Sequence, residues 1–358
     1  MRLAHRQQAA RLRLTAKIGV KLMEASNTPS SLQDLRNFFS RLETQVAQEA
    51  EAEIAIVGPV NSGKSTLFNR LKGKNLSRTS PVPGTTREIL SERFGPFRLV
   101  DTPGFGEVAG VDRANIARQA VALADLTVLV LDAAAGVRQD DADLYAELRR
   151  TGVAVVVALN KIDLISRSLD NVLYDVEKRL RTPVIPISAK TGKGIAERLI
   201  PAIIDSHPKM AVAVGRSLPA FRKLAGRRVI RQSVSAAAVL GLEPVPILAV
   251  PLLVAVQIRM LLRLGTIYGE PVNARRARDL LTAIAGGVAI RYAAQEIAKL
   301  LPVAGWLVSA VVAASGTWAL GRVAILYFES GGKLTPAQMQ EMYRRLRMRR
   351  PHEEETAK

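Results

Sequence analysis

The sequence of 358 residues contains no cysteine and only three histidines. The absence of cysteine excludes disulfides and thiolate metal sites, and it fits a reducing compartment. His5, His207 and His352 show no spacing typical of metal ligands, so we expect them on the surface. Aromatic residues are also few, at 4% of the chain, whereas apolar residues make up 48%, which is ample for a core.

Acidic residues are scarce relative to basic ones: 32 stand against 51, which gives a net charge of +19 at pH 7. The excess is concentrated in residues 207–358, which hold 22 basic and 9 acidic side chains. Such a positive field attracts anionic partners, either nucleic acid or an anionic membrane surface. Residues 1–26 lack the apolar core of a secretory signal and have no acid before Glu24. This pattern favours a basic amphipathic helix, with an organelle transit peptide as the alternative.

Short apolar runs alternate with helical stretches in the first two thirds of the chain. The expected strands are 52–57, 98–101, 126–133, 153–160 and 183–188. The expected helices include 138–150, 169–181 and a last one at about 194–205. This alternation predicts a mostly parallel sheet with helices on both faces. The composition becomes basic from Lys209 onward, so we place a domain boundary at residue 206.

The stretch "GPVNSGKS", Gly58 to Ser65, fits the phosphate-loop pattern G-x-x-x-x-G-K-S between an apolar strand and a helix. Its glycines let backbone N–H groups point at phosphates. Lys64 supplies a charge for the terminal phosphates, and Ser65 offers a hydroxyl to Mg²⁺. The helix that starts there adds its partial positive charge. The loop residues predicted to bind nucleotide are Gly58, Asn61, Ser62, Gly63, Lys64, Ser65 and Thr66.

Three further motifs follow expected strands. "DTPG" places Asp101 where an acid can hold Mg²⁺ through water, and the Gly104 N–H can face the terminal phosphate. "NKID" ends in Asp163, whose carboxylate suits the adjacent ring N–H and amino donors of guanine and not adenine. "SAK" can offer a backbone N–H to the guanine oxygen. The residues predicted to bind the base are Asn160, Lys161, Asp163, Ser188, Ala189 and Lys190.

These four motifs, in this order and spacing, resemble those of a translation-factor-class GTPase. The stretches "STLFNRLKG" (65–73) and "PGTTRE" (83–88) resemble the Era/TrmE/EngA group of bacterial small GTPases, over about residues 52–206. The resemblance implies an α/β P-loop GTPase domain that hydrolyses GTP to GDP and phosphate as a conformational switch. It implies that Thr86, with Thr85 as the alternative, closes on Mg²⁺ and the γ-phosphate. The catalytic residues are then Lys64, Thr86 and Gly104, and the magnesium ligands are Ser65, Thr86 and Asp101.

Hydrolysis needs a water in line with the γ-phosphate and a charge that offsets the one developing there. Ras-like enzymes place this water with a glutamine, but Phe105 stands at that position. Some members of the resembled group use a potassium ion held partly by a phosphate-loop asparagine, where this chain has Asn61. We therefore expect slow hydrolysis that K⁺ stimulates; in the alternative, Asn61 only caps the loop. Arg87 in the switch is expected to be a solvated charge rather than an arginine finger.

Residues from about 215 to 330 resemble a helical domain that follows GTPase domains in many bacterial proteins, mostly described as membrane proteins of unknown activity. The resembling stretches are "LEPVPILAVPLLVAVQIRMLLRLGTIYG" and "AAQEIAKLLPVAGWLVSAVVAASGTWALGRVAILYFE". Three prolines interrupt the apolar run 232–258, which predicts two short helices in a hairpin with Glu243 in its turn. A second run, Leu300–Gly321, has 22 residues without a charge. It is long enough to span a bilayer.

The predicted fold is therefore an α/β P-loop GTPase domain followed by an all-α, apolar and basic domain. The tail is expected to form a helix with Thr335 as its N-cap and Pro336 at its first position. The predicted regions are a basic N-terminal helical extension (1–51), the GTPase domain (52–206), a membrane-associated helical domain (207–332) and a basic C-terminal helix and tail (333–358).

We expect the GTPase domain in the cytoplasm, with the helical domain on or in a membrane. The alternatives are a helical domain whose apolar faces form its own core, an RNA- or ribosome-binding assembly GTPase, and a scaffold that binds GTP with little turnover. RNA is the less favoured partner, because residues 207–358 show neither a G-x-x-G loop of the KH type nor aromatic residues on strands. A GTP-dependent homodimer is a further expectation, because G domains of this type often pair across their nucleotide faces.

Overall fold

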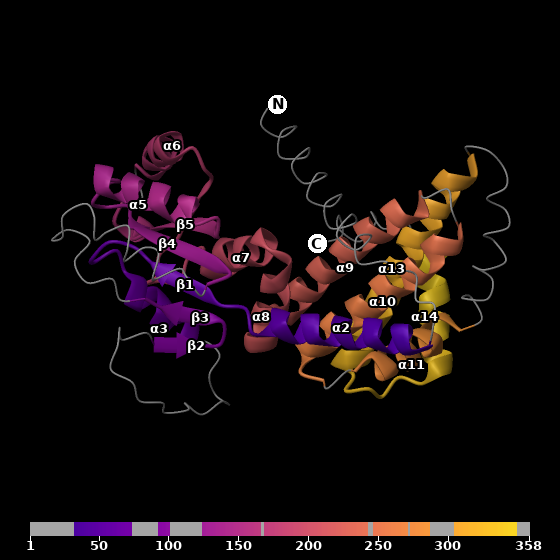
Figure 1. Cartoon of the computed structure of the whole chain (residues 1–358). Coiled ribbons are helices and arrows are strands. Elements are labelled where there is room, and N and C mark those ends of the chain that lie inside the picture. Colours follow the sequence, from indigo (N-terminus) through magenta and orange to yellow (C-terminus); the bar gives the residue numbers. More distant parts are fainter. Residues whose placement is uncertain are drawn as a thin grey trace. The chain divides into compact units, whose positions relative to one another are not determined.

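Figure 1 shows a computed structural model of the whole chain. The structure describes residues 32–73, 92–100, 124–165, 168–242, 246–270, 273–286 and 304–348. These residues form two compact units. The first comprises residues 49–225, and the second combines residues 32–48 with residues 226–348.

The first unit is built on a six-stranded sheet with the strand order β2-β3-β1-β4-β5-β6. The strands are β1 (Ile54–Val57), β2 (Glu92–Phe94), β3 (Phe97–Leu99), β4 (Leu126–Asp132), β5 (Ala154–Asn160) and β6 (Val184–Pro186). Every neighbouring pair is parallel except β2–β3, which is antiparallel. In the register, Ile54 lies opposite Phe97 of β3 and opposite Leu126 of β4. The mostly parallel sheet predicted from the sequence is confirmed.

Helices cover both faces of this sheet, so its central strands are apolar along nearly their whole length. In Figure 1, α5 (Gln139–Arg150) and α6 (Leu169–Leu180) lie on one side and α3 (Lys64–Gly73) lies on the other. Residues of β1 and β4 that point to the α5–α6 side form one core cluster with Leu148 and Val176. The unit therefore has the α/β architecture that the sequence predicts for a P-loop GTPase domain.

The first unit continues beyond residue 206. A short π-helix, η2 (Ile195–Leu199), leads into α7 (Ile200–Ser206), and α8 (Pro208–Ser217) follows directly. His207 caps α8, because its Nδ1 accepts a hydrogen bond from the Lys209 N–H at 3.3 Å. The Lys209 ammonium pairs with Asp125, which precedes β4, at 2.8 Å. A 3-10 turn, η3 (Pro219–Phe221), then connects α8 to α9.

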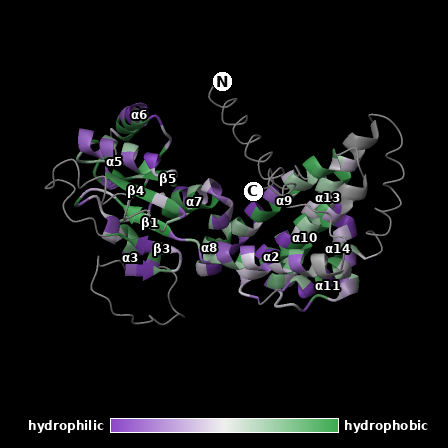
Figure 2. Cartoon of the chain, viewed as in Figure 1, coloured by the Kyte–Doolittle hydropathy of each residue, from purple (hydrophilic) through white to green (hydrophobic). Residues whose placement is uncertain are grey.

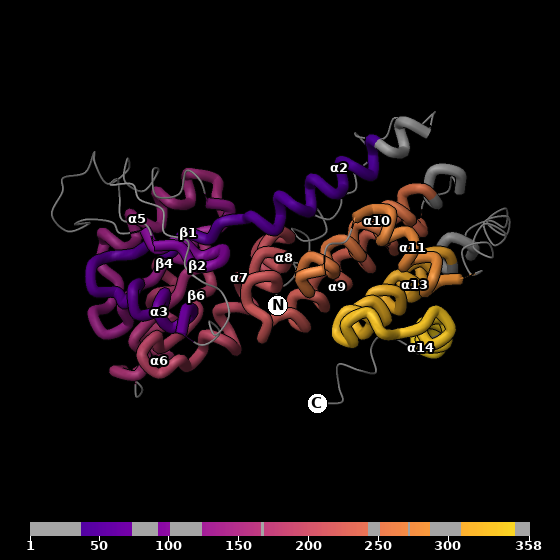
Figure 3. The backbone as a smooth tube through the Cα atoms, turned by 90° about the horizontal axis from the view of Figure 1, so that it is seen from below, coloured from indigo at the N-terminus to yellow at the C-terminus, as the bar shows by residue number. Residues whose placement is uncertain are grey.

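The second unit is entirely helical in its described part, as predicted. Its helices are α2 (Leu32–Ala50), α9 (Arg222–Gly241), α10 (Pro246–Tyr268), α11 (Ala274–Ala285), α13 (Ala304–Glu329) and α14 (Pro336–Met348). Figure 3 shows the same helices from below. Hydrophobic residues run along α9, α10 and α13 (Figure 2). The buried apolar residues of the unit come mainly from α10 and α13, and α9, α11 and α14 contribute fewer.

The predicted hairpin is present, but its helices are longer than expected, with 20 residues in α9 and 23 in α10. Residues 243–245, between the two helices, lie outside the described residues, and so does the predicted position of Glu243. Pro251 was expected to interrupt the run, but it lies inside α10. Because most of the helix that follows Pro251 is packed inside the unit, this packing outweighs the loss of one backbone donor.

Two helix ends show how the sequence sets the element boundaries. At α14, the Thr335 hydroxyl accepts from the Gln338 N–H at 3.3 Å, and Gln338 Oε1 accepts from the Thr335 N–H at 2.9 Å. This reciprocal capping box confirms the predicted start of the helix. At α11, Asn273 Oδ1 accepts from the Arg276 N–H at 2.9 Å. Glu43 of α2 accepts from the Ala274 N–H, so the N-terminal helix is hydrogen-bonded to α11.

The helices α9, α10 and α13 come into close contact at Gly321. A Cβ atom at this position would lie 2.5 Å from Ile230 Cγ1 of α9 and 3.1 Å from Met260 Sδ of α10. A second close approach occurs at Gly241, where a Cβ atom would lie 2.5 Å from the Ala310 Cα of α13. Glycine at these positions lets the helix backbones pack closely, and the two contacts fix the antiparallel register of α9 and α13.

Within the described residues, two helical segments are long and apolar enough to cross a membrane. They are Pro251–Tyr268, with mean hydropathy 1.3, and Ser309–Glu329, with mean hydropathy 1.4. The second overlaps the predicted run Leu300–Gly321, and it includes Arg322. In both segments 56% of the residues are buried inside the unit, and the core helix of a soluble protein shows the same length and composition.

Candidate functional site

The loop between β1 and α3 has the backbone conformation that a phosphate loop requires. Gly58 (φ +152°) and Gly63 (φ +92°) adopt positive φ angles. A Cβ atom would lie 2.2 Å from the Val130 carbonyl oxygen at Gly58 and 2.2 Å from Asn160 Nδ2 at Gly63. Only glycine fits these two positions. Asn61 also has a left-handed backbone, with φ +61°.

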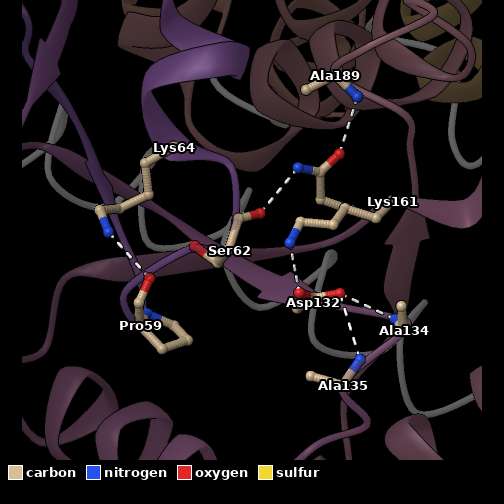
Figure 4. Close-up of polar contacts among 9 residues, drawn as sticks. Pro59, Ser62, Lys64, Asp132, Ala134, Ala135, Lys161 and Ala189 are labelled. Atoms are coloured by element: carbon tan, nitrogen blue, oxygen red, sulfur yellow. Dashed lines mark hydrogen bonds and ion pairs between the residues drawn. The ribbon is translucent and has the colours of Figure 1, made fainter. Parts of the chain in front are cut away.

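Lys64 lies at the start of α3 and is buried. Its ammonium donates a hydrogen bond to the Pro59 carbonyl oxygen at 3.0 Å, across the phosphate loop (Figure 4). This contact holds the positive charge over the loop. Ser65 and Thr66 follow on the first turn of α3, and both are exposed to solvent. The first turn of a helix carries backbone N–H groups that have no partner within the helix, so this end of α3 favours an anion.

Asn160 connects three of the predicted motifs. It lies at the end of β5 and is almost completely buried. Its Nδ2 donates to the Ser62 carbonyl oxygen of the phosphate loop at 2.8 Å, and its Oδ1 accepts from the Ala189 N–H at 2.8 Å. Residues separated by 98 and 29 positions are thereby joined through one side chain. The Ala189 N–H therefore already donates to Asn160. A hydrogen bond to a guanine oxygen would come from the N–H of its neighbour Lys190, or from the Ala189 N–H after it leaves Asn160.

Two buried polar atoms of the site lack a hydrogen-bond partner among the described residues. They are Asp163 Oδ1, in the 3-10 turn η1 (Ile162–Leu164), and the Ser62 hydroxyl oxygen. A buried acceptor without a donor destabilises the protein unless a ligand supplies one. The carboxylate of Asp163 is therefore suited to accept hydrogen bonds from a bound base.

Lys161 precedes this turn in a left-handed conformation, with φ +65°. Its ammonium pairs with Asp132 Oδ2 at 2.6 Å, and Asp132 Oδ1 accepts from the Ala134 and Ala135 N–H groups at 2.9 and 3.3 Å (Figure 4). Asp132 stands at the end of β4, next to Asn160 in the sheet register. Sequence reasoning missed this residue, although an acid that ends the apolar run "LTVLVLDA" is a visible signal.

Arg70 is a second residue that sequence reasoning missed. From α3 it donates through Nε to the Ala189 carbonyl oxygen at 3.1 Å and through Nη2 to the Lys190 carbonyl oxygen. The loop that contains both residues is closed internally, because Ser188 Oγ accepts from the Thr191 N–H at 3.1 Å. Arg70 thus connects the phosphate-loop helix to the predicted base-binding loop. The sequence contains one signal for Arg70, because this residue lies in the stretch "STLFNRLKG" that carries the family resemblance.

Several predicted residues lie outside the described residues. They are Thr85, Thr86, Arg87, Asp101, Gly104 and Phe105. Of the predicted magnesium ligands, the structure therefore describes Ser65 alone. Within the described ranges there is no cluster of three or more histidine, aspartate or glutamate side chains that could hold a metal ion.

Residues 53–161 match the family described as "50S ribosome-binding GTPase". The chain therefore contains a GTPase domain. It is 37% identical to GTPase Der of Desulforudis audaxviator over 206 residues, which are 55% of this chain and 46% of that protein. It is 33% identical to the tRNA modification GTPase MnmE of Moorella thermoacetica over 184 residues, 47% of this chain and 39% of that protein. The predicted membership in the Era/TrmE/EngA-like group is confirmed for this domain.

A solved structure of Era in complex with MgGDPNP and 16S ribosomal RNA is 27% identical, and it covers 52% of this chain and 67% of that chain with a TM-score of 0.34. The chain spans less than half the length of the curated relatives that it matches. Membership therefore applies to the GTPase domain and does not extend to the helical unit.

We expect Arg70→Lys to weaken guanine-nucleotide binding about 5- to 20-fold, because a lysine cannot donate to two carbonyl oxygens in the fixed geometry of a guanidinium. Titration with a fluorescent GDP analogue measures this effect. The matched control is Lys72→Ala on the same helix, which removes an exposed ion pair with Glu92 and should leave the affinity unchanged. Equal affinity of Arg70→Lys and the unchanged chain would contradict this role.

Proposed function

We propose that this chain binds GTP and hydrolyses it to GDP and phosphate, and that the exchange between the two states acts as a conformational switch. The observation that carries this proposal is the convergence of the phosphate loop, Asn160 and Ala189 through two 2.8 Å hydrogen bonds, with the unpaired carboxylate oxygen of Asp163 nearby in sequence. The family match over residues 53–161 supports it independently.

In this proposal, Asp163 recognises the guanine base through hydrogen bonds to its carboxylate. Guanine presents a ring N–H and an amino group side by side, and a carboxylate can accept from both. Adenine presents no such pair on that edge. The buried and unpaired Oδ1 atom gives a physical reason for strong selectivity, because binding of the wrong base leaves the acceptor unsatisfied.

Replacement of Asp163 by asparagine tests this assignment. We expect Asp163→Asn to lower GTP affinity at least about 100-fold and to create affinity for xanthosine triphosphate, because an amide donor matches the carbonyl group of xanthine. Competition binding with the two nucleotides measures both effects. The control is Asp175→Asn, an exposed residue on α6, which should bind as the unchanged chain does. Undiminished GTP binding by Asp163→Asn would exclude Asp163 from base recognition.

For hydrolysis, the phosphates would lie against the first turn of α3, with the Lys64 ammonium exchanging its Pro59 carbonyl contact for the terminal phosphates. Mg²⁺, held by Ser65, Thr86 and Asp101, would neutralise charge on the phosphates when bound. We propose that Gly104 donates its N–H to the γ-phosphate and that Thr86 closes over it. No glutamine follows the Asp-x-x-Gly motif, so intrinsic turnover is slow.

We propose that K⁺ at Asn61 supplies part of the missing charge. Asn61 is exposed on the phosphate loop in a left-handed conformation, which glycine also adopts without strain. We expect several-fold faster hydrolysis in potassium chloride than in sodium chloride at equal ionic strength, and we expect Asn61→Gly to lose this difference. Equal turnover of the unchanged chain in both salts would contradict the proposal.

We propose further that the switch operates at an anionic membrane surface, with the GTPase domain in the cytoplasm. Support comes from the two apolar segments Pro251–Tyr268 and Ser309–Glu329 and from the positive charge of residues 207–358. An RNA- or ribosome-binding assembly role is the alternative, because the matching family is described as ribosome-binding.

Cell fractionation distinguishes a role at the membrane from a role in ribosome assembly. We expect the full chain in the membrane pellet and expect it to remain there through a wash with high salt, because burial of apolar residues in lipid does not depend on salt. Release by salt alone would mean that the basic residues hold the chain at the surface. A chain that remains in the cytosol and sediments with ribosomes would contradict the membrane setting and favour the assembly GTPase.

A further inference from the structure

Asp132 lies at the carboxyl end of β4, outside the four motifs from which the nucleotide-binding residues were predicted. In the sheet register it stands opposite Asn160 of β5. The N–H of the next residue, Ala133, donates to the Asn160 carbonyl oxygen at 2.9 Å. The two strands are therefore hydrogen-bonded up to the point where both leave the sheet. This pairing places the Asp132 carboxylate beside the residue that follows Asn160 in the chain, which is Lys161.

The two carboxylate oxygens of Asp132 have different partners. Oδ1 accepts from the Ala134 and Ala135 N–H groups at 2.9 and 3.3 Å, which fixes the carboxylate against its own loop (Figure 4). Oδ2 pairs with the Lys161 ammonium at 2.6 Å, and the two side chains are only 17% and 31% exposed. Because the backbone already orients the carboxylate, only the lysine side chain loses freedom on pairing. Such a pair is more stabilising than one between two mobile, exposed side chains.

The backbone of Lys161 depends on support of this kind. Its φ and ψ angles are +65° and +31°, in the left-handed region. A residue with a Cβ atom adopts this conformation at a cost and keeps it where surrounding interactions hold it there. The ion pair with Asp132 is one such interaction, and it joins Lys161 to the neighbouring strand.

The conformation of Lys161 sets the direction of the turn η1 that follows it. The Leu164 N–H donates to the Lys161 carbonyl oxygen at 3.0 Å, and the Ile162 N–H donates to the Ile187 carbonyl oxygen at 3.3 Å. Asp163 is the middle residue of this turn. A change of Lys161 away from the left-handed conformation would rotate the turn. It would move the Asp163 carboxylate, whose buried Oδ1 has no hydrogen-bond partner among the described residues.

We propose that Asp132 is a positioning residue for guanine recognition. Its carboxylate holds Lys161, and Lys161 in turn holds η1 in the conformation that directs the Asp163 carboxylate to the base. Asp132 acts through Lys161 and does not itself touch the nucleotide. This inference rests on the proposed role of Asp163 and goes beyond it, because it assigns base selectivity in part to a residue of a different strand.

A positioning role predicts an effect on the base contact and not on the phosphate contacts. The hydrogen bonds of the phosphate loop, from Lys64 to Pro59 and from Asn160 to Ser62, do not involve Asp132. Inosine diphosphate separates the two kinds of contact, because its base keeps the ring N–H of guanine and lacks the amino group. Its binding therefore depends less on the exact position of a carboxylate that accepts from both donors. The preference for GDP over inosine diphosphate is the quantity to measure.

The first test is Asp132→Asn in the full chain. Asparagine keeps an oxygen for the Ala134 and Ala135 N–H groups and removes the charge that pairs with Lys161. We expect the affinity for GDP to fall about 5- to 20-fold and the affinity for inosine diphosphate to fall less than about 3-fold. Competition against a fluorescent GDP analogue in the presence of Mg²⁺ measures both. The matched control is Asp143→Asn on α5, an exposed aspartate, which should leave both affinities unchanged.

A second variant tests whether the effect passes through the ion pair. Lys161→Met keeps most of the length of the side chain and removes the ammonium. We expect it to reduce the preference for GDP as well. Adding Asp132→Asn to Lys161→Met should then cause no further loss, because the pair is already broken. Losses that add in the double variant would mean that the two residues act independently, and they would overturn the proposal.

The remaining outcomes distinguish this inference from the proposed role of Asp163. If the unchanged chain binds GDP and inosine diphosphate equally well, the role of Asp163 in base recognition is contradicted, and the positioning role of Asp132 with it. If the unchanged chain prefers GDP and Asp132→Asn keeps the full preference, the positioning role alone is overturned. An equal loss of affinity for both nucleotides would also overturn it, because Asp132 would then support the loop without directing the base contact.

Discussion

The buried amide of Asn160 is the interaction on which the nucleotide site depends. Its two hydrogen bonds tie the phosphate loop to the loop after β6, and each group that it pairs would otherwise be a buried backbone group without a partner. The close fit of Gly63 against Asn160 Nδ2 shows how little space separates these segments. Loss of this side chain would remove both bonds together and leave Arg70 of α3 as a remaining link to the loop after β6.

The parallel sheet explains why motifs so far apart in the sequence meet. β1, β4 and β5 run in the same direction, so the phosphate loop, Asp132 and Asn160 all follow the carboxyl ends of adjacent strands. Ligands of open α/β sheets bind at this edge. The second unit has a different organisation, in which glycines at helix crossings allow close packing and the position of arginines separates an apolar part from a basic part.

Much of this arrangement was predictable from local patterns. The apolar runs at β1, β4 and β5, the phosphate-loop glycines and the Thr335 cap all have a local cause that is readable in sequence. Arg70 and Asp132 were missed because their partners lie 119 and 29 positions away and only the fold brings them together. Pro251 was misjudged because tertiary packing outweighed a local preference. The register of α9, α10 and α13 also depends on the fold, and the close contacts at Gly321 show it.

The central claim is that the chain recognises guanine and discriminates against adenine through the Asp163 carboxylate, whose buried Oδ1 has no hydrogen-bond partner among the described residues. The most direct measurement is calorimetric titration of the full chain with GTP and with ATP in the same buffer with Mg²⁺. The account predicts GTP binding at least about 100-fold tighter than ATP binding, because adenine leaves Asp163 unsatisfied. Equal affinity for the two nucleotides, or no binding of GTP, would contradict it.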